Sequence, residues 1–178
     1  NAAIDYKLAN NSKKNNKLML ENFDLKVWDR DLDVSLKGSL ICTKIFSKFM
    51  KKNKYGIILN VASDLGLIAP DNRIYNSGKK LRIVKPVSYS VSKHGVIGLT
   101  RYTASYFAKD NIRCNAIAPG GIKNRQNKNF LKKINKLIPL GRLAENNEYK
   151  GAILFLISEA SSYMTGSVLT LDGGRTVW

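Results

Sequence analysis

The sequence predicts an α/β fold built on a parallel sheet. Three short segments are apolar on both faces, as buried parallel strands are: residues 57–62, 112–118 and 168–171. Each follows a longer segment with apolar residues at helical spacing: residues 24–54, 87–107 and 145–158. This alternation of helix and strand is typical of a parallel sheet covered by helices. Because no linker divides residues 1–178, we expect a single domain.

The first helix is predicted to follow a polar loop, rich in Lys and Asn, over residues 6–22. Asp24 is placed to cap its N-terminus, and apolar residues recur at helical spacing from Val27 to Phe49. Basic residues in the last turn, followed by Gly56, are typical of a helix C-terminus. Gly38 predicts a kink or a close contact within this helix.

The first strand ends before Ser63, and the segment from there to Pro86 has the Pro, Asp, Asn and Gly content of a loop. Its length indicates a function beyond connecting two elements. Pro86 is suited to open the second helix. Small side chains in that helix, such as Ser88, Ser92 and Gly95, predict that another element packs closely against it.

The second strand ends at a turn formed by Pro119, Gly120 and Gly121. A basic segment over residues 123–136 follows it and has a weak amphipathic pattern. The third strand ends at a second Gly-rich turn, residues 172–174. We therefore expect turns with little side-chain bulk at the ends of two neighbouring strands.

The composition is that of a folding chain, with 44% hydrophobic and 24% charged residues. Thirty Lys and Arg against 13 Asp and Glu give a net charge of +17. Such a charge is typical of proteins that bind nucleic acids or anionic membranes. Lys outnumbers Arg by 22 to 8, although Arg is the better phosphate ligand. The basic clusters at 13–17, 48–54 and 128–136 lack interleaved aromatic residues, so we expect solvated faces and no nucleic-acid partner.

No apolar run reaches the length of a membrane span, and the first residues lack the pattern of a signal peptide. Cys42 and Cys114 lie in apolar segments without a CxxC pair or a Cys/His cluster. We expect both to be buried small hydrophobic residues, without a disulfide or a metal site. These features favour a cytoplasmic protein without a membrane partner.

Tyr89 and Lys93 lie four residues apart on the second predicted helix, and this spacing places them on one face. A free phenol has a pKa near 10, so a phenol that shuttles protons at pH 7 needs a neighbouring positive charge. By itself the spacing also fits a solvated pair on a helix surface. His94, one position further, points away from that face and is predicted to pack or lie at the surface.

Four segments resemble the short-chain dehydrogenase/reductase family in the order in which that family has them. They are IILNVAS ending in Ser63, YSVSKHG containing Tyr89 and Lys93, NAIAPGGI, and YMTGSVLTLDGG. The resemblance implies a Rossmann-like, doubly wound parallel sheet. It also implies an enzyme that interconverts a hydroxyl and a carbonyl on a small molecule, with NAD or NADP as cofactor.

The resemblance assigns roles to individual residues. Tyr89 would be the general acid/base, Ser63 would hydrogen-bond the substrate oxygen, and Lys93 would support Tyr89 and hold the nicotinamide ribose. The turn formed by Pro119, Gly120, Gly121 and Ile122 would contact the nicotinamide. Such groups stabilise the negative charge that develops on a carbonyl oxygen when hydride arrives.

The first residues, Asn1, Ala2 and Ala3, resemble the end of the family's NNAG strand and are expected to bind the cofactor. On this alignment the chain is the C-terminal two-thirds of the fold and begins at its fourth strand. The N-terminal βαβ units are missing, together with the TGxxxGxG loop that binds the cofactor phosphates. The preference for NAD or NADP is therefore not readable.

Two further positions depart from the family. Ser35 stands where an Asn usually takes part in a proton relay, and Asn124 stands near the place of a Thr that contacts the cofactor. We expect Ser35 to hold a water in the relay. Asn124 either keeps a hydrogen bond to the cofactor or lies at the surface.

An insertion near residues 72–85 and a substrate loop near 120–145 are expected to flank the active site. The insertion resembles the subgroup that acts on sugars of bacterial surface glycans and flagellin, which implies a sugar or nucleotide-sugar substrate. The alternatives are a 3-oxoacyl carrier-protein reductase, whose acidic partner would suit the positive charge, and an inactive remnant of the family.

The family also implies a homodimer or homotetramer formed through the two long helices. Their small residues permit close packing between subunits. Trp28 is expected in the core, and Trp178 against a partner subunit.

Overall fold

In the computed structural model, which describes residues 16–75 and 83–178, three parallel strands form one sheet. They are β1 (Gly56–Val61), β2 (Ile112–Pro119) and β3 (Val168–Leu171), in the order β1-β2-β3. Gly56 pairs with Ile112 at one end of the sheet, and Pro119 pairs with Leu171 at the other. The predicted strands are confirmed to within one residue at each end.

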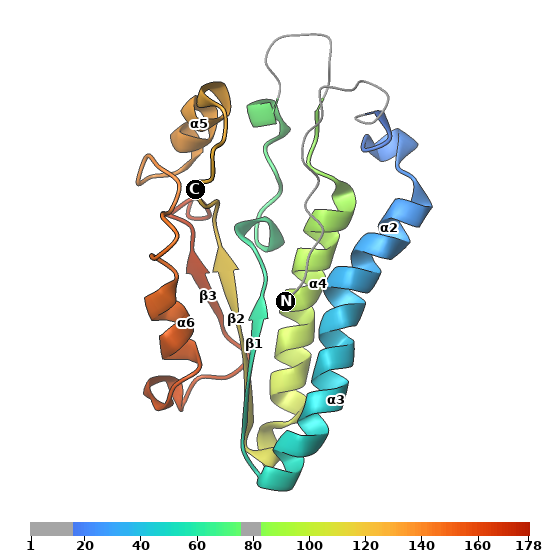
Figure 1. Cartoon of the computed structure of the whole chain (residues 1–178), viewed down its shortest axis with the longest axis vertical. Helices are drawn as coiled ribbons and strands as arrows, with labels where there is room; N and C mark the ends of the chain where they lie inside the picture. The colour runs from blue at the N-terminus through green and yellow to red at the C-terminus, as the bar shows by residue number, and fades with distance from the viewer. Residues whose placement is uncertain (1–15, 76–82) are drawn as a thin grey trace.

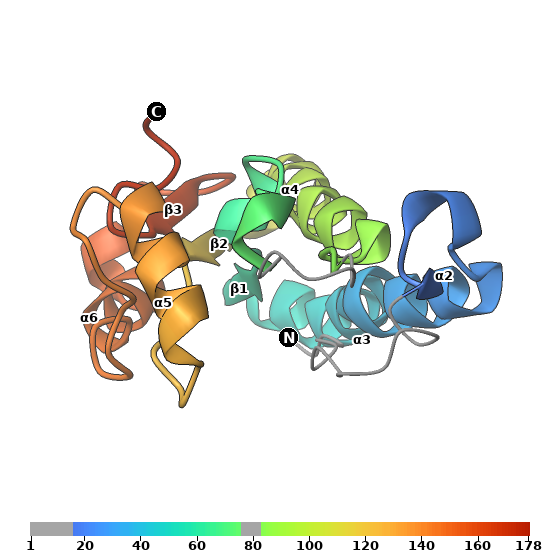
Figure 2. The ribbon, with the colours of Figure 1, turned by 90° about the horizontal axis from the view of Figure 1, so that it is seen from above.

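Helices cover both faces of this sheet (Figures 1 and 2). The long helices α3 (Gly38–Asn53) and α4 (Val87–Tyr106) lie on one face, and α6 (Lys150–Leu156) lies on the other. The short helix α5 (Lys128–Ile134) lies beyond the carboxyl ends of the strands. The sheet is therefore doubly wound, as predicted.

The first predicted helix consists of three consecutive segments. The helix α2 (Leu25–Leu32) begins after Asp24, whose Oδ1 accepts a hydrogen bond from the Lys26 N–H at 2.9 Å. A π-helical segment, Asp33–Lys37, joins α2 to α3. The irregularity therefore lies immediately before Gly38, close to the predicted kink, and it contains Ser35.

The sheet is packed on both faces. Ala116 and Ala118 of β2 face Val96 and Ile97 of α4, whereas Ile117 faces Leu156 and Tyr149 on the α6 side. Alternate residues of one strand therefore enter two different apolar layers, which is why apolar residues occupy both faces of the strands. A buried hydrogen bond from the Asn60 Nδ2 to the Thr100 Oγ1, at 2.9 Å, also ties β1 to α4.

The helical spacing of apolar residues did not predict which of them are buried. Five apolar residues of α3 lie exposed on the part of the chain that the structure describes: Leu40, Ile41, Ile45, Phe46 and Phe49. Small side chains, Thr43 and Ser47, are buried instead. Tyr106 of α4 is exposed as well. Periodicity identifies an apolar stripe but not the element that covers it.

Other expectations need smaller corrections. The helix predicted for residues 145–158 is shorter, because Glu148 accepts hydrogen bonds from the Glu145 N–H and from both Arg142 Nη atoms in a turn that precedes α6. Cys42 is exposed, although it was expected to be buried, whereas Cys114 is buried. Among the described residues, no helix is both long enough and apolar enough to cross a membrane.

Candidate active site

The three strands end at one edge of the sheet, and the predicted site residues follow these ends (Figure 1). Ser63 follows β1, the turn over residues 119–122 follows β2, and the turn over residues 172–175 follows β3. The first turns of α4, which carry Tyr89 and Lys93, lie beside the end of β1. Ligands bind at this edge in open α/β sheets.

Ser63 is held by the short 3-10 helix η3 (Asp64–Gly66), which it caps. Its Oγ donates to the Asp64 Oδ1 at 2.8 Å and accepts from the Leu65 N–H at 3.2 Å. A Cβ atom on Gly66 would lie 2.9 Å from the Lys93 carbonyl oxygen. Glycine therefore lets η3 pack directly against α4, which fixes Ser63 relative to the helix that carries Tyr89.

Lys93 is buried, and its Nζ donates to the Val61 carbonyl oxygen at 2.8 Å. Burial lowers the pKa of Lys93, and the positive charge of Lys85 lowers it further. The Lys93 Nζ lies 5.9 Å from the centroid of the Tyr89 ring, and the Lys85 Nζ lies 4.0 Å from it. Two ammonium groups therefore lie near the Tyr89 ring, and the sequence indicated only that of Lys93.

A cavity of about 540 Å³ joins these elements. Its polar wall contains Ser63, Tyr89 and Lys85. The turn after β2 adds four predicted residues to the wall: Pro119, Gly120, Gly121 and Ile122. Apolar residues from the 72–75 segment and from the region around α5 form the remainder: Ile74, Tyr75, Phe130, Ile134, Ile138 and Leu143. The structure thus brings Ser63, Tyr89 and the predicted nicotinamide turn to one cavity, beside Lys93.

The Gly120 turn is fixed by backbone packing. The Gly120 N–H donates to the Leu171 carbonyl oxygen at 2.8 Å, and the Gly120 carbonyl oxygen accepts from the Tyr149 hydroxyl at 3.1 Å. A Cβ atom on Gly120 would lie 2.8 Å from the Cα of Asp172, so the position requires glycine. Burial raises the pKa of Tyr149 to about 12, which keeps this phenol a hydrogen-bond donor.

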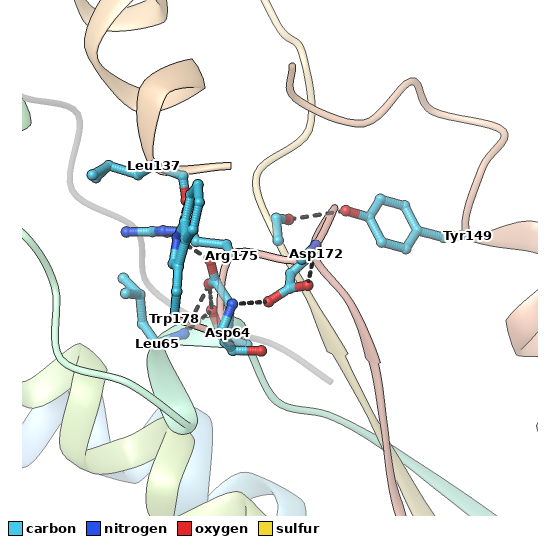
Figure 3. Close-up of polar contacts among 11 residues, drawn as sticks. Asp64, Leu65, Leu137, Tyr149, Asp172, Arg175 and Trp178 are labelled. Atoms are coloured by element: carbon cyan, nitrogen blue, oxygen red, sulfur yellow. Dashed lines mark hydrogen bonds and ion pairs between the residues drawn. The ribbon is translucent and has the colours of Figure 1, made fainter. Parts of the chain in front are cut away.

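The sequence missed a buried ion pair at the site (Figure 3). Arg175, in the C-terminal turn, donates from Nη1 to the Asp64 Oδ2 at 2.6 Å. Asp172 holds this turn by accepting from the Gly174 and Thr176 N–H groups. Both members of the ion pair adjoin segments that carry the family resemblance, but their separation of 111 residues leaves no local signal.

The other predicted site residues, Ser35, Asn124 and residues 1–3, are not all found at the cavity. Ser35 is buried in the π-helical segment, which contacts α4, but it does not line the cavity. Asn124 lines the cavity and is exposed; its N–H donates to the Gln126 Oε1 at 2.6 Å. Asn1, Ala2 and Ala3 lie outside the described residues.

His94, Trp28 and Trp178 do not line the cavity. His94 is exposed, with its Nδ1 2.9 Å from the Ser90 carbonyl oxygen. Trp28 is partly buried, and the Trp178 Nε1 donates to the Leu137 carbonyl oxygen. Within residues 16–75 and 83–178, no group of three or more His, Cys, Asp or Glu side chains could hold a metal ion.

Known proteins that resemble this chain in sequence and in structure are enzymes of one family. The family profile described as Enoyl-(Acyl carrier protein) reductase matches residues 3–176, nearly the whole chain. Among solved structures, the crystal structure of a short chain dehydrogenase from Leptospira borgpetersenii with bound NAD+ superposes with a TM-score of 0.80 at 34% identity, over 88% of this chain and 59% of that one. The chain belongs to the short-chain dehydrogenase/reductase family.

Two curated relatives show the range of the family. The 3-oxoacyl-[acyl-carrier-protein] reductase FabG of Thermotoga maritima is 35% identical over 96% of this chain and 65% of its own length. The 2-dehydro-3-deoxy-D-gluconate 5-dehydrogenase of Bacillus subtilis is 33% identical over 98% of this chain and 65% of its own length. The chain spans about two-thirds of the length of these relatives.

Proposed function

We propose that this chain carries the catalytic part of an NAD(P)-dependent oxidoreductase that interconverts a hydroxyl and a carbonyl group. The observation that supports it is the meeting of Ser63, Tyr89 and the Gly120 turn at one cavity, with the Lys93 ammonium group 5.9 Å from the Tyr89 ring. These groups come from three separate elements. Such convergence is the pattern of a catalytic site rather than of a solvated surface pair.

In this proposal Tyr89 donates its proton to the carbonyl oxygen during reduction and accepts a proton from the alcohol during oxidation. The positive charges of Lys93 and Lys85 favour the phenolate that forms in reduction. The Ser63 hydroxyl donates to Asp64, so its oxygen has a lone pair available for a substrate alcohol. In reduction the same hydroxyl would turn toward the substrate oxygen, where negative charge develops.

The residues present fit the nicotinamide end of the cofactor. Lys93 has three N–H donors, of which one goes to the Val61 carbonyl oxygen, so others can reach ribose hydroxyls. The Gly120 turn and Asn124 border the same cavity and offer backbone and amide groups. When bound, the nicotinamide ring supplies or accepts the hydride. NAD and NADP are equally compatible with these residues, and Asn1 to Ala3 are proposed to contribute.

The finer assignments are also proposals. A sugar or nucleotide-sugar substrate of bacterial surface-glycan or flagellin modification is supported by the insertion, of whose described residues Ile74, Tyr75 and Lys85 line the cavity. The 2-dehydro-3-deoxy-D-gluconate 5-dehydrogenase relative is consistent with a sugar substrate, whereas the FabG relative supports the 3-oxoacyl alternative.

Residues 120–145 would form the substrate loop, and Ser35 would hold a relay water. The free cysteines are consistent with the cytoplasm.

The test is the variant Tyr89→Phe in the purified full chain, assayed with a panel of alcohols and carbonyls by nicotinamide absorbance. We expect turnover to fall by about 10²-fold or more, because general acid/base catalysis contributes that much. Tyr102→Phe, on an exposed tyrosine of the same helix, is the matched control and should retain turnover. Equal activity in Tyr89→Phe and wild type would refute the catalytic assignment.

The alternative of an inactive remnant predicts a folded chain that binds no dinucleotide. Titration with NADH and NADPH, followed by fluorescence, separates it from the enzyme. Saturable micromolar binding supports the enzyme, and its absence in a folded protein supports the remnant.

We also propose a homodimer or homotetramer formed through α3 and α4. The exposed residues Phe46 and Phe49 of α3 and Tyr102 of α4 supply apolar surface for it. Light scattering measures the molar mass of wild type and of Phe46→Glu in solution. If α3 lies in the interface, the charged substitution should dissociate the oligomer and lower this molar mass.

A further inference from the structure

We propose that Arg175 is a positioning residue that controls how readily the Ser63 hydroxyl donates to the substrate oxygen. It acts through Asp64, whose carboxylate is hydrogen-bonded to both side chains (Figure 3). The inference rests on the proposed function, in which Ser63 contacts the substrate oxygen. It gives a role to a residue of the C-terminal turn to which the sequence resemblance assigns none.

The hydrogen-bonding capacity of Ser63 is largely used within the protein. A hydroxyl has one proton to donate and two lone pairs. The Ser63 proton goes to the Asp64 Oδ1 at 2.8 Å, and one lone pair accepts from the Leu65 N–H at 3.2 Å. This leaves at most one lone pair for a ligand. To donate to a carbonyl oxygen, the hydroxyl must exchange Asp64 for the substrate as its acceptor, with its O–H bond intact.

Arg175 makes this exchange less costly. Asp64 is buried, with 3% of its surface exposed, so its carboxylate oxygens depend on donors from the protein. Oδ1 also accepts from the Leu65 N–H at 2.8 Å, and Oδ2 accepts from the Arg175 Nη1 at 2.6 Å. When Ser63 turns away, both oxygens therefore keep a donor. Without Arg175, the buried charge would lose its counter-ion and would hold the Ser63 hydroxyl more tightly.

Direct contact between Arg175 and the substrate is the competing role, because Arg175 also lines the cavity. Two observations favour the role through Asp64. The Arg175 Nη1 is committed to the carboxylate at 2.6 Å, and 8% of the side chain is exposed. In addition, Asp172 fixes the turn that carries Arg175 by accepting from two of its N–H groups. A side chain restrained in this way is suited to hold Asp64 in place.

A double-mutant cycle between Arg175 and Ser63 in the full chain tests the proposal. The probes are ethyl acetoacetate and 4-oxocyclohexanecarboxylate, reduced with NADH or NADPH. We expect Ser63→Ala to lower kcat about 10²-fold, the effect of losing one donor to the developing oxyanion. Arg175→Met should lower kcat about fivefold to tenfold, because the hydroxyl stays with Asp64. In the Ser63→Ala background, Arg175→Met should change kcat by less than about twofold, because the hydroxyl through which it acts is gone.

Further variants separate this role from a loss of folding, and circular dichroism checks that each protein is folded. The double variant Asp64→Asn/Arg175→Met replaces the buried charge with a neutral acceptor, which holds a hydroxyl less tightly. Its kcat should therefore return to within about threefold of wild type. Arg175→Lys keeps a charged donor and should stay equally close. If Arg175→Met does not fold, Arg175→Gln, which keeps a neutral donor, takes its place in the cycle.

The control Arg142→Met breaks an exposed ion pair whose residues do not line this cavity, and it should leave kcat unchanged in both backgrounds. The proposal is wrong if Arg175→Met lowers kcat by the same factor with and without the Ser63 hydroxyl, because Arg175 would then act on another group. It is also wrong if Arg175→Met raises KM and leaves kcat unchanged, the result expected for direct substrate binding. In both cases, turnover that depends on Tyr89 would leave the proposed function intact.

If wild type reduces neither probe, the proposed function fails on these compounds and the unfolding equilibrium decides the inference. The same cycle is then measured by urea unfolding, followed by circular dichroism. Ser63→Ala should raise the unfolding equilibrium constant about fivefold more in the Arg175→Met background than in wild type, because the unpaired carboxylate depends more on the hydroxyl. Equal effects of Ser63→Ala in both backgrounds overturn the proposal.

Discussion

Arg175 donates a hydrogen bond from Nη1 to the Oδ2 of Asp64 at 2.6 Å, with 8% and 5% of their side chains exposed. The other carboxylate oxygen of Asp64 accepts from the Ser63 hydroxyl. The C-terminal turn is therefore connected through one carboxylate to the residue proposed to contact the substrate oxygen (Figure 3). A segment far from Ser63 in the sequence thus helps to determine its orientation.

Loss of this ion pair should be costly. Arg175→Met leaves the Asp64 carboxylate buried without its cation, and we expect the free energy of unfolding to fall by about 3–5 kcal/mol. Urea unfolding followed by circular dichroism measures this. The double variant Asp64→Asn/Arg175→Met should be more stable than Arg175→Met alone, because no unpaired charge remains.

The matched control is Arg142→Met, which breaks the ion pair between Arg142 and Glu148 in an exposed turn. Exposed pairs contribute about 0–1 kcal/mol, so this variant should remain close to wild type. Equal effects of Arg142→Met and Arg175→Met would show that burial does not strengthen the Asp64 pair.

Two glycines should respond oppositely to the same change. A Cβ atom on Gly66 meets backbone atoms of Lys93 at 2.9 and 3.0 Å, so Gly66→Ala must push η3 away from α4. We expect a loss of about 1–3 kcal/mol in unfolding free energy. Gly98 lies in α4 with nothing within 4 Å of its Cβ position, so Gly98→Ala should gain up to about 1 kcal/mol. Thermal unfolding of both variants tests the prediction, which an unchanged Gly66→Ala would contradict.

The buried Lys93 predicts a specific pH dependence of stability. Its pKa is lower in the folded chain than the ordinary value of 10.5, mainly because of burial. Between these two pKa values the unfolded chain binds more protons, so the free energy of unfolding should rise with pH in that window. Lys93→Met should flatten this rise, and urea unfolding from neutral pH to about pH 10 measures it.

The exposed Lys109 gives the comparison, since Lys109→Met should leave the pH dependence of wild type unchanged. A wild-type profile that is flat in this window, or equal in Lys93→Met, would contradict the assigned burial of the ammonium group.

Cys114 should resist alkylation. Its side chain is buried in β2, and burial raises the pKa of its thiol to about 12, so little thiolate forms near pH 8. We expect iodoacetamide to leave Cys114 unmodified in the folded chain and to modify it in urea, as mass spectrometry of peptides would show. Equal labelling in both conditions would mean that β2 opens readily.

The sequence determined the arrangement of elements around the site. Apolar runs without alternation predicted β1, β2 and β3, and helical spacing predicted α4, because both patterns depend on residues close together in the chain. The residues that follow the strands, such as Ser63 and Gly120, were found for the same reason. Parallel strands then place these residues at one edge, whatever the details of packing.

Tertiary structure decided which distant side chains meet. The pairing of Asp64 with Arg175 and the position of Lys85 over Tyr89 depend on how separate segments pack, and no local spacing encodes them. The exposure of the apolar stripe on α3 has the same origin, since periodicity shows that a face is apolar but not what covers it. Sequence alone thus determined the strands, the helix α4 and the proposed catalytic residues. Packing in three dimensions determined which charged side chains lie near them, because charge interactions depend on distance through space.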